Sequence, residues 1–308
     1  MNYLVSISGG KDSTATLLHA LDTVPFDSIK GVFADTGNEH ESTYQYVDYL
    51  EQQTGVKIHH VKADFSDRWQ HRIEYVRDKW AGKGVPAEII ESVLIVLEMG
   101  ATGNPFLDLC ILKGRFPSRM AQFCTQELKV IPCTEYLLEL VDEFGIVESW
   151  QGVRAEESPN RAKLPERENK GGGYLIYRPI HKWNVEQVFA IHKKHGVEPN
   201  PLYKLGMNRV GCMPCINCAK GELLEISKRF PEHVERIYEW EKMVSAAARQ
   251  QNATFFAVDG GDNDTAFQRG NIRQKVEWSK TLHGGKKMDL FSVFEESAAC
   301  SSAYGLCE

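Results

Sequence analysis

Residues 4–14 read L-V-S-I-S-G-G-K-D-S-T, an apolar run that gives way at once to helix-forming residues. A glycine-rich turn between a strand and a helix directs backbone N–H groups toward one point and makes an anion site. The glycines let the backbone approach a phosphate, Lys11 adds a positive charge, and Ser8 and Ser13 add hydroxyl donors. Asp12 is unusual beside phosphate unless it binds a divalent cation or orients Lys11. The spacing differs from Walker A, so the stretch predicts another class of phosphate loop; the alternative is a tight turn without a ligand.

Bulk composition is that of an ordinary globular protein. The 308 residues are 42% hydrophobic and 25% charged, with a net charge of −6. This charge argues against a passive, charge-driven nucleic-acid coat, but it allows a local basic groove. No run approaches the roughly 20 apolar residues of a membrane span, and no secretory leader is visible. We therefore expect a cytoplasmic protein without a membrane partner.

Strand-like runs predict the fold class. They lie at Tyr3–Ile7, Ile29–Ala34, Val56–Val61, Val147–Val153 and Tyr174–Ile180. The first three alternate with helical patterns at Ser13–Leu21 and Glu41–Thr54. Such alternation is typical of parallel strands joined by right-handed crossovers. We predict an α/β fold with a doubly wound, mostly parallel five-stranded sheet.

The remaining segments suggest two domains. Residues 66–145 have helical patterns and predict a helical insertion, whereas the polar residues 156–173 predict a mobile loop. A cysteine-rich segment and a long helix from about Glu222 to Gln250 follow Asn200-Pro201. We expect a nucleotide-binding α/β domain over residues 1–205 and a cysteine-rich helical region over 206–308.

Several motifs together resemble a known family. S-G-G-K-D-S at 8–13 resembles the pyrophosphate loop of the PP-loop ATP pyrophosphatases, and most of all that of the phosphoadenosine-phosphosulfate reductase family. F-A-D-T-G-N-E at 33–39, G-V-R-A-E-E-S at 152–158 with Arg161, P-I-H-K-W at 179–183 and N-P-L-Y at 200–203 are also similar to family motifs, in the family's order. The resemblance spans roughly residues 3–230 and implies an adenine nucleotide α-hydrolase-like fold.

The resemblance and the residue chemistry together predict a site for ATP and Mg²⁺. The expected nucleotide-binding residues are Ser8, Gly9, Gly10, Lys11, Asp12, Ser13, Phe33, Asp35 and Gly152, and the expected catalytic residues are Lys11, Asp12, Arg154 and Arg161. Asp35 and Glu39 follow a strand that ends beside the first loop, where doubly wound sheets bind ligands. They would serve a metal, a ribose or the loop itself. The alternatives are a helix N-cap for Asp35 and a solvated charge for Arg161.

Four cysteines predict a metal centre. Cys212, Cys215 and Cys218 form C-x-x-C-x-x-C, which resembles the short ferredoxin run that holds a [4Fe–4S] cluster, and Cys124 is the fourth candidate. Zinc on four thiolates is the rival interpretation, and buried unligated thiols are a third. C-T-Q-E-L-K at 124–129 and R-V-G-C-M-P-C at 209–215 resemble cluster-ligand motifs of the family's iron–sulfur DNA-phosphorothioation branch. Cys300 and Cys307 suggest a redox pair, sulfur carriers or free thiols.

Three functions fit these features. The first is an ATP pyrophosphatase that adenylates an acceptor for iron–sulfur-dependent sulfur transfer, with a cysteine desulfurase or another sulfur donor as partner. The second is a phosphoadenosine or adenosine phosphosulfate reductase, although the family's E-C-G-I-H-like C-terminal cysteine motif is not found in A-Y-G-L-C-E at 303–308. The third is a nucleotide-sensing subunit of a modification or defence complex.

The expected acceptor is nucleic acid, with DNA backbone phosphate ahead of a tRNA base. Cations gather near the expected mouth of the site: Lys113, Arg115, Arg119, Arg161, Lys163, Arg167 and Lys170. They would hold a phosphate backbone and make binding salt-dependent. The alternative is that they are ordinary solvated surface charges.

Overall fold

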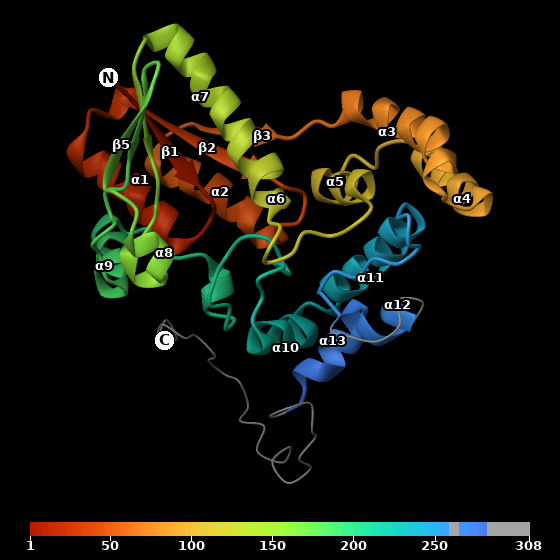
Figure 1. Ribbon diagram of the computed structural model, residues 1–308. Helices are drawn as coiled ribbons and strands as arrows, with labels where there is room; N and C mark the ends of the chain where they lie inside the picture. Colours follow the sequence, from red (N-terminus) through yellow and green to blue (C-terminus); the bar gives the residue numbers. More distant parts are fainter. Residues whose placement is uncertain (259–264, 282–308) are drawn as a thin grey trace.

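A six-stranded sheet forms the centre of the computed structural model, which describes residues 1–258 and 265–281 (Figure 1). Within these residues the strand order is β3-β2-β1-β4-β6-β5. The strands are β1 Asn2–Ile7, β2 Ile29–Asp35, β3 Ile58–Lys62, β4 Val147–Trp150, β5 Arg167–Gly171 and β6 Tyr174–Tyr177. Neighbouring strands are parallel except β5 and β6. The predicted doubly wound, mostly parallel sheet is confirmed.

The predicted strand number was too low, because β5 lies in the segment expected to be a mobile loop. β5 pairs antiparallel with β6 through a glycine turn, in which Gly171, Gly172 and Gly173 all have positive φ. It is an edge strand with mostly exposed residues, so it lacks the apolar alternation that signals a half-buried strand. The Arg167 guanidinium lies 3.7 Å from the Tyr177 ring centroid and ties β5 to β6.

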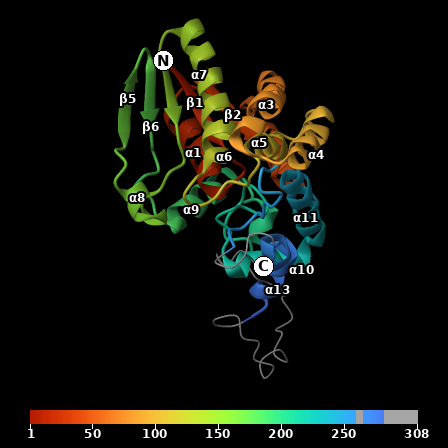
Figure 2. The ribbon, with the colours of Figure 1, turned by 45° about the vertical axis from the view of Figure 1, so that its right-hand side comes forward.

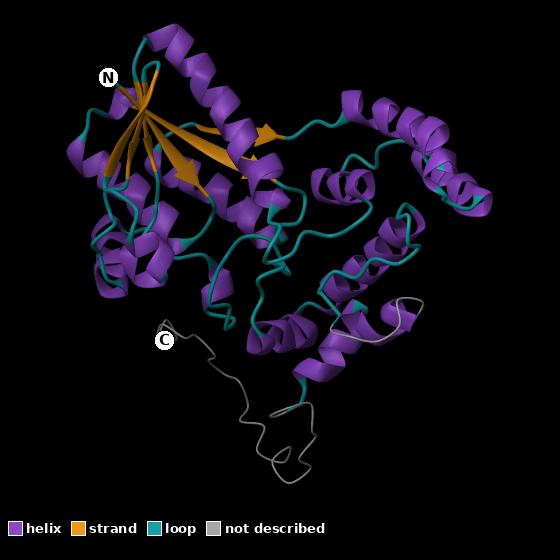
Figure 3. Cartoon of the chain, in the orientation of Figure 1, coloured by secondary structure: helices purple, strands orange, loops and turns teal. Residues whose placement is uncertain are grey.

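Helices cover both faces of the sheet (Figure 3). One face packs against α1 Lys11–Thr23, α2 Glu41–Thr54 and α9 Val185–His195. The other packs against α7 Ile131–Phe144, which contributes Leu137 and Leu140 to a core with Leu4 and Val32. Alternate residues of β1 therefore enter opposite cores.

A second helical layer lies beside the sheet (Figure 2). Its elements are α3 Ser66–Lys79, α4 Ala87–Glu98, α5 Pro105–Lys113, α10 Lys220–Arg229, α11 Pro231–Ala246, α12 Ala266–Gly270 and α13 Ile272–Ser279. One core joins the insertion to the C-terminal helices, with residues from Phe65 to Leu128 packed among residues from Leu202 to Val276. The boundary near residue 205 stays a prediction. No helix of the described chain is long and apolar enough to span a membrane.

The single long helix predicted for residues 222–250 is in fact two. α10 ends at Arg229 and α11 begins at Pro231, which occupies the first turn of the new helix. Proline lacks an N–H and clashes with the preceding turn, so it starts a helix readily but interrupts one.

The stability of the folded protein is expected to depend on pH because of Glu241. Its buried carboxylate accepts the N–H groups of Phe255 at 2.7 Å and Ile272 at 2.8 Å. Burial raises its pKa from 4.5 to about 7, although these N–H groups oppose the shift. Between those values the folded state holds a proton that the unfolded state lacks, so stability falls as pH rises.

Glu241→Gln removes this titration. Between pH 4.5 and about pH 7, wild type should therefore lose about 3 kcal/mol of unfolding free energy relative to the variant. Urea unfolding at the two ends of the window measures it. A difference that does not change with pH would contradict the prediction.

Candidate functional site

The loop between β1 and α1 is built as a phosphate cradle. Gly10 is the N-cap of α1 and offers no side-chain cap, and the first N–H group of the helix, that of Lys11, is taken by the Tyr203 hydroxyl. The Ser13 hydroxyl accepts the Ser8 N–H at 3.1 Å and donates to the Gly10 carbonyl at 2.9 Å. Gly9 has φ +73°, and an added Cβ would lie 2.7 Å from Thr43 Cγ2. Glycine at this position is therefore required by both backbone and packing.

Residues from the far end of the domain hold this loop in place. The Lys11 N–H donates to the Tyr203 hydroxyl at 3.0 Å, and the Asn200 amide donates to the Gly9 carbonyl at 3.1 Å. His192 Nε2 lies 3.0 Å from the Lys11 carbonyl oxygen, which fixes the proton on Nε2 because a carbonyl only accepts. Burial lowers the pKa of His192, which keeps the ring neutral in this role.

Asp12 is held between two cations. Its Oδ2 lies 3.0 Å from Lys11 Nζ, and its Oδ1 accepts the Arg154 Nε–H at 2.5 Å. The Arg154 side chain is almost buried and also pairs with Glu156. Both Asp12 oxygens are thus engaged with cations, which favours the role of orienting Lys11 and Arg154. Each oxygen keeps a further lone pair that could face a Mg²⁺ ion carried by the nucleotide phosphates.

Two neighbouring cavities share lining residues at the loop. The inner cavity, about 320 Å³, lies between the sheet and α7 and includes Phe33, Cys133 and Tyr174 in a mostly apolar lining. The outer cavity, about 930 Å³, is lined by Lys11, Arg154 and other polar side chains. Ser8, Ser13, Lys129 and Gly152 line both. The apolar end has the chemistry for a base and the cationic end that for phosphates.

The predicted site residues are mostly together. Phe33 lines the inner cavity, and Arg161 lines the outer one while paired with Glu157. Asp35 differs, since it lines neither cavity in the described chain and instead accepts the Gly37 N–H at 2.9 Å and the Tyr44 hydroxyl at 2.7 Å. Among the roles expected for Asp35, loop support is the one that these contacts favour.

Gly152 brings the loop after β4 against the start of α1. An added Cβ would lie 2.8 Å from the Asp12 carbonyl oxygen and 2.9 Å from the Ser13 nitrogen, and backbone atoms cannot move aside alone. Gly152→Ala should weaken nucleotide binding about tenfold or more, because overpacking costs roughly 1–3 kcal/mol. Titration with a fluorescent ATP analogue measures this.

Gly82→Ala is the matched control, because its Cβ would meet nothing within 4 Å. Equal affinities for the two variants would show that the Gly152 contact does not shape the loop.

The four candidate cysteines converge beside the outer cavity. Gly211 and Asn217, from the cysteine segment, line that cavity together with Lys11. Cys124 and Cys215 pack against the helical core, and they are close enough for their charges to interact. The Asn217 N–H donates to Cys215 Sγ at 3.4 Å, as N–H groups do around cluster sulfurs.

Charged side chains lie near these sulfurs. Burial raises the pKa of Cys212 to about 12. Lys129 and Arg209 interact electrostatically with Cys212 and Cys215, so they would compensate bound thiolates.

Glu39 connects the sheet to the cysteine segment. It is buried, accepts the Thr36 hydroxyl at 2.7 Å, and pairs with Lys129 Nζ at 3.7 Å. Its Oε1 lies 3.5 Å from Cys212 Sγ, and its backbone pairs with that of Cys212. Among the roles expected for Glu39, loop support is the one these contacts favour.

Sequence reasoning missed a histidine pair near the cysteines. His40 and His233 stack at 5.0 Å, and with Glu41 their ligand atoms lie within 4.8 Å. His40 Nδ1 accepts the Ser42 N–H at 3.0 Å, so a neutral ring carries its proton on Nε2, the atom that faces Glu41. This tautomer does not suit a metal ligand. His233 Nδ1 lies 3.3 Å from the carbonyl of Met213, beside the cysteines. The pair therefore braces the cysteine segment.

The predicted basic mouth is only partly present. Arg119 and Arg161 line the outer cavity. Lys113, Arg167 and Lys170 pair with Glu127, Glu148 and Glu168, which neutralises much of their charge.

The fold and the loop define a PP-loop nucleotide-binding α/β protein. The family model described as phosphoadenosine phosphosulfate reductase domain matches residues 2–86 and 112–218, which is more than half of the chain. The chain belongs to this family, whose members are enzymes.

Relatives and a solved structure extend this comparison. The chain is 42% identical over 327 residues to an uncharacterized 37.8 kDa protein of Escherichia phage 186, covering 99% of this chain and 96% of that protein. It is 27% identical over 198 residues to the phosphoadenosine 5'-phosphosulfate reductase of Photorhabdus laumondii, and spans 64% of that enzyme. It is also similar to the phosphoadenylyl-sulfate reductase of Candida auris, with TM-score 0.43 and 19% identity over 70% of this chain and 83% of that one.

Proposed function

We propose that the chain splits ATP between the α and β phosphates and uses the adenylate to activate an acceptor for iron–sulfur-dependent sulfur transfer. The observation that carries this proposal is the outer cavity. The phosphate loop lines one wall, and residues of the cysteine segment, including Arg209 and Gly211, line another. Phosphate chemistry and sulfur chemistry would therefore take place in one space.

The proposed reaction assigns a role to each charged group. An acceptor oxygen attacks the α-phosphorus, the α–β phosphate bond breaks, and pyrophosphate leaves. Lys11 and Arg154 stabilise charge on the phosphates, and Asp12 holds both cations in position. Arg161 closes the outer edge of the cavity from α8 Pro159–Ala162. A sulfur nucleophile from a donor such as a cysteine desulfurase then displaces AMP from the acceptor.

Cys124, Cys212, Cys215 and Cys218 would hold a [4Fe–4S] cluster, which supplies electrons or a sulfur-binding iron when bound. The acceptor we propose is nucleic acid, either DNA backbone phosphate or a tRNA base. Other subunits of a modification complex would be natural partners.

Sulfonucleotide reduction is the second candidate, and the family and the Photorhabdus reductase favour it. Such a substrate would use the same inner cavity and the same phosphate loop. The two reactions differ in product, since reduction releases sulfite and adenylation releases pyrophosphate.

Product analysis separates the candidates. Anaerobic protein is incubated with ATP plus nucleic acid as the acceptor, and separately with each sulfonucleotide plus a dithiol reductant, and pyrophosphate, phosphate and sulfite are measured. We expect pyrophosphate from ATP. Sulfite without pyrophosphate would establish the reductase, whereas binding of ATP without any product would favour the nucleotide-sensing subunit.

A further inference from the structure

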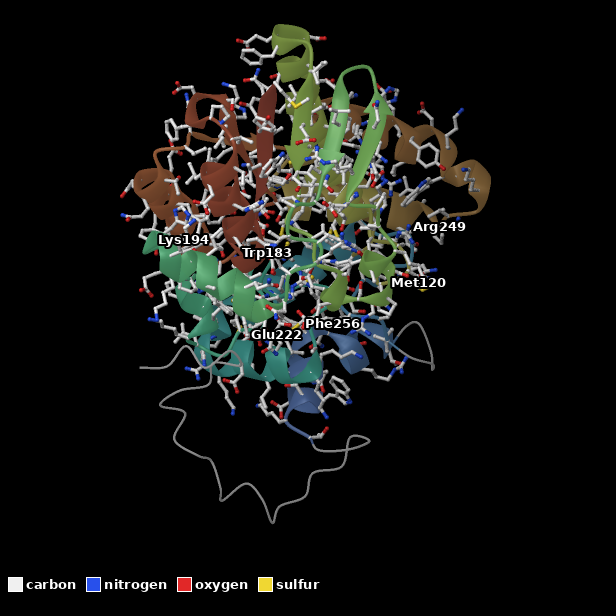
Figure 4. All side chains as sticks on the ribbon, turned by 90° about the vertical axis from the view of Figure 1, so that its left-hand side faces the viewer. Met120, Trp183, Lys194, Glu222, Arg249 and Phe256 are labelled. Carbon is white, nitrogen blue, oxygen red and sulfur yellow. The ribbon has the colours of Figure 1, made fainter. Side chains whose placement is uncertain are left out.

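A separate cavity of about 470 Å³ opens beside the cysteine segment. Its floor is apolar and includes the buried side chains of Ile216, Leu223 and Phe255. Met120 and Phe256 also line it, and they appear on the same side of the molecule below the sheet (Figure 4). Because Cys218 lines this cavity as well, a ligand here would lie next to the proposed cluster.

The open side of this cavity combines an aromatic ring with positive charge. The Trp278 side chain is 46% exposed. Lys220 Nζ lies 4.6 Å from its ring centroid and Lys275 Nζ lies 5.9 Å away. Arg119 is a third cation, and the described lining contains no carboxylate. Exposed aromatic faces beside cations are the features with which proteins bind unpaired bases and their phosphates.

Arg119 links this cavity to the nucleotide. It lines both the aromatic cavity and the outer cavity that contains Lys11 and Arg154. A ligand with its base at Trp278 and a phosphate at Arg119 would extend toward the phosphate loop. A polymer is long enough to do so, whereas a mononucleotide is not. The concave apolar floor also suits an inserted flat base better than the broad surface of an acidic protein.

We propose that this cavity binds a base of single-stranded nucleic acid, and that the adjoining backbone passes Arg119 on its way to the activated nucleotide. This inference rests on the proposed function and specifies its acceptor as a single strand. It predicts that affinity for the strand depends on Trp278 and on the lysines, while handling of ATP does not.

Fluorescence anisotropy with labelled single-stranded DNA and RNA of about twelve nucleotides tests it, since such sites cover roughly 4–16 nucleotides. Trp278→Ala should weaken binding roughly 5- to 150-fold, the range that base stacking provides. Trp278→Phe should retain part of the affinity. Lys220→Gln with Lys275→Gln should weaken binding and reduce its salt dependence.

The matched control is Tyr75→Ala. Tyr75 is also exposed and has Lys83 Nζ 4.9 Å from its ring centroid, but it lies outside the cavity. Affinity unchanged in Trp278→Ala, no binding of any strand to wild type at low salt, or equally tight Trp278-dependent binding of a mononucleotide would each overturn the inference. Pyrophosphate release from ATP is measured in every variant. If it persists while strand binding fails, the pyrophosphatase proposal stands without this acceptor site; if it is absent in wild type, the proposed function fails.

Discussion

Lys11→Ala is expected to reduce pyrophosphate release from ATP at least about 100-fold while the fold is retained. Removing one preorganised charge at a developing anion typically costs about 10²–10³ in kcat. The variant should remain folded because Asp12 keeps its ion pair with Arg154. Nucleotide affinity should fall as well, since Lys11 is one of the cations that line the phosphate end of the cavity.

Asp12→Asn should separate the orientation of Lys11 and Arg154 from the binding of the nucleotide phosphates. Loss of its charge removes repulsion toward the phosphates, so nucleotide binding should not weaken. Turnover should nevertheless fall at least about 100-fold, because Lys11 and Arg154 lose the carboxylate that positions them. Equilibrium titration and product assays on the same samples distinguish the two effects.

Lys182→Ala is the matched control, because Lys182 pairs with Glu166 at 3.1 Å but is 81% exposed. It should behave as wild type, since exposed pairs contribute little. If the Lys11 and Asp12 variants release pyrophosphate as fast as this control, the loop does not act on phosphate.

The phosphate loop could be predicted from the sequence because its chemistry is local. The strand, the two glycines, the lysine and the two hydroxyl groups are adjacent in the chain. The structure brings Ser8 and Ser13 into hydrogen-bond contact. The supports of the loop could not be predicted in the same way. Tyr203 and His192 contact Lys11 across more than 180 residues, and their apolar or helical surroundings give no sign of that contact.

Errors in the predicted fold have equally physical causes. The strand-like runs that contain β2 and β4 are buried along almost their whole length. The edge strand β5 is mostly exposed, so its sequence lacks a comparable signal. The break at Pro231 was visible in the sequence as a helix-starting proline, but an apolar periodicity that continues across it concealed the boundary. The role of Asp35 in nucleotide binding stays a prediction, and the structure shows that its side chain accepts the Gly37 N–H of its own turn.

Loss of any one of the four cysteines is expected to remove the metal centre. Anaerobically purified protein should be brown with close to four irons per chain, and oxygen should bleach it. Cys124→Ser and Cys212→Ser should each lose most of the iron, because a hydroxyl is a poor substitute for a thiolate ligand. Cys133→Ser is the control, since Cys133 lines the inner cavity instead and should keep the iron.

Metal content tests the cysteine set independently of activity. The phosphate loop is held by Tyr203, Asn200 and the Arg154–Asp12 pair, none of which is a cysteine. Affinity for ATP should therefore persist in Cys212→Ser, so that loss of turnover in that variant reports the sulfur step. A colourless wild-type protein with one zinc per chain would contradict the cluster.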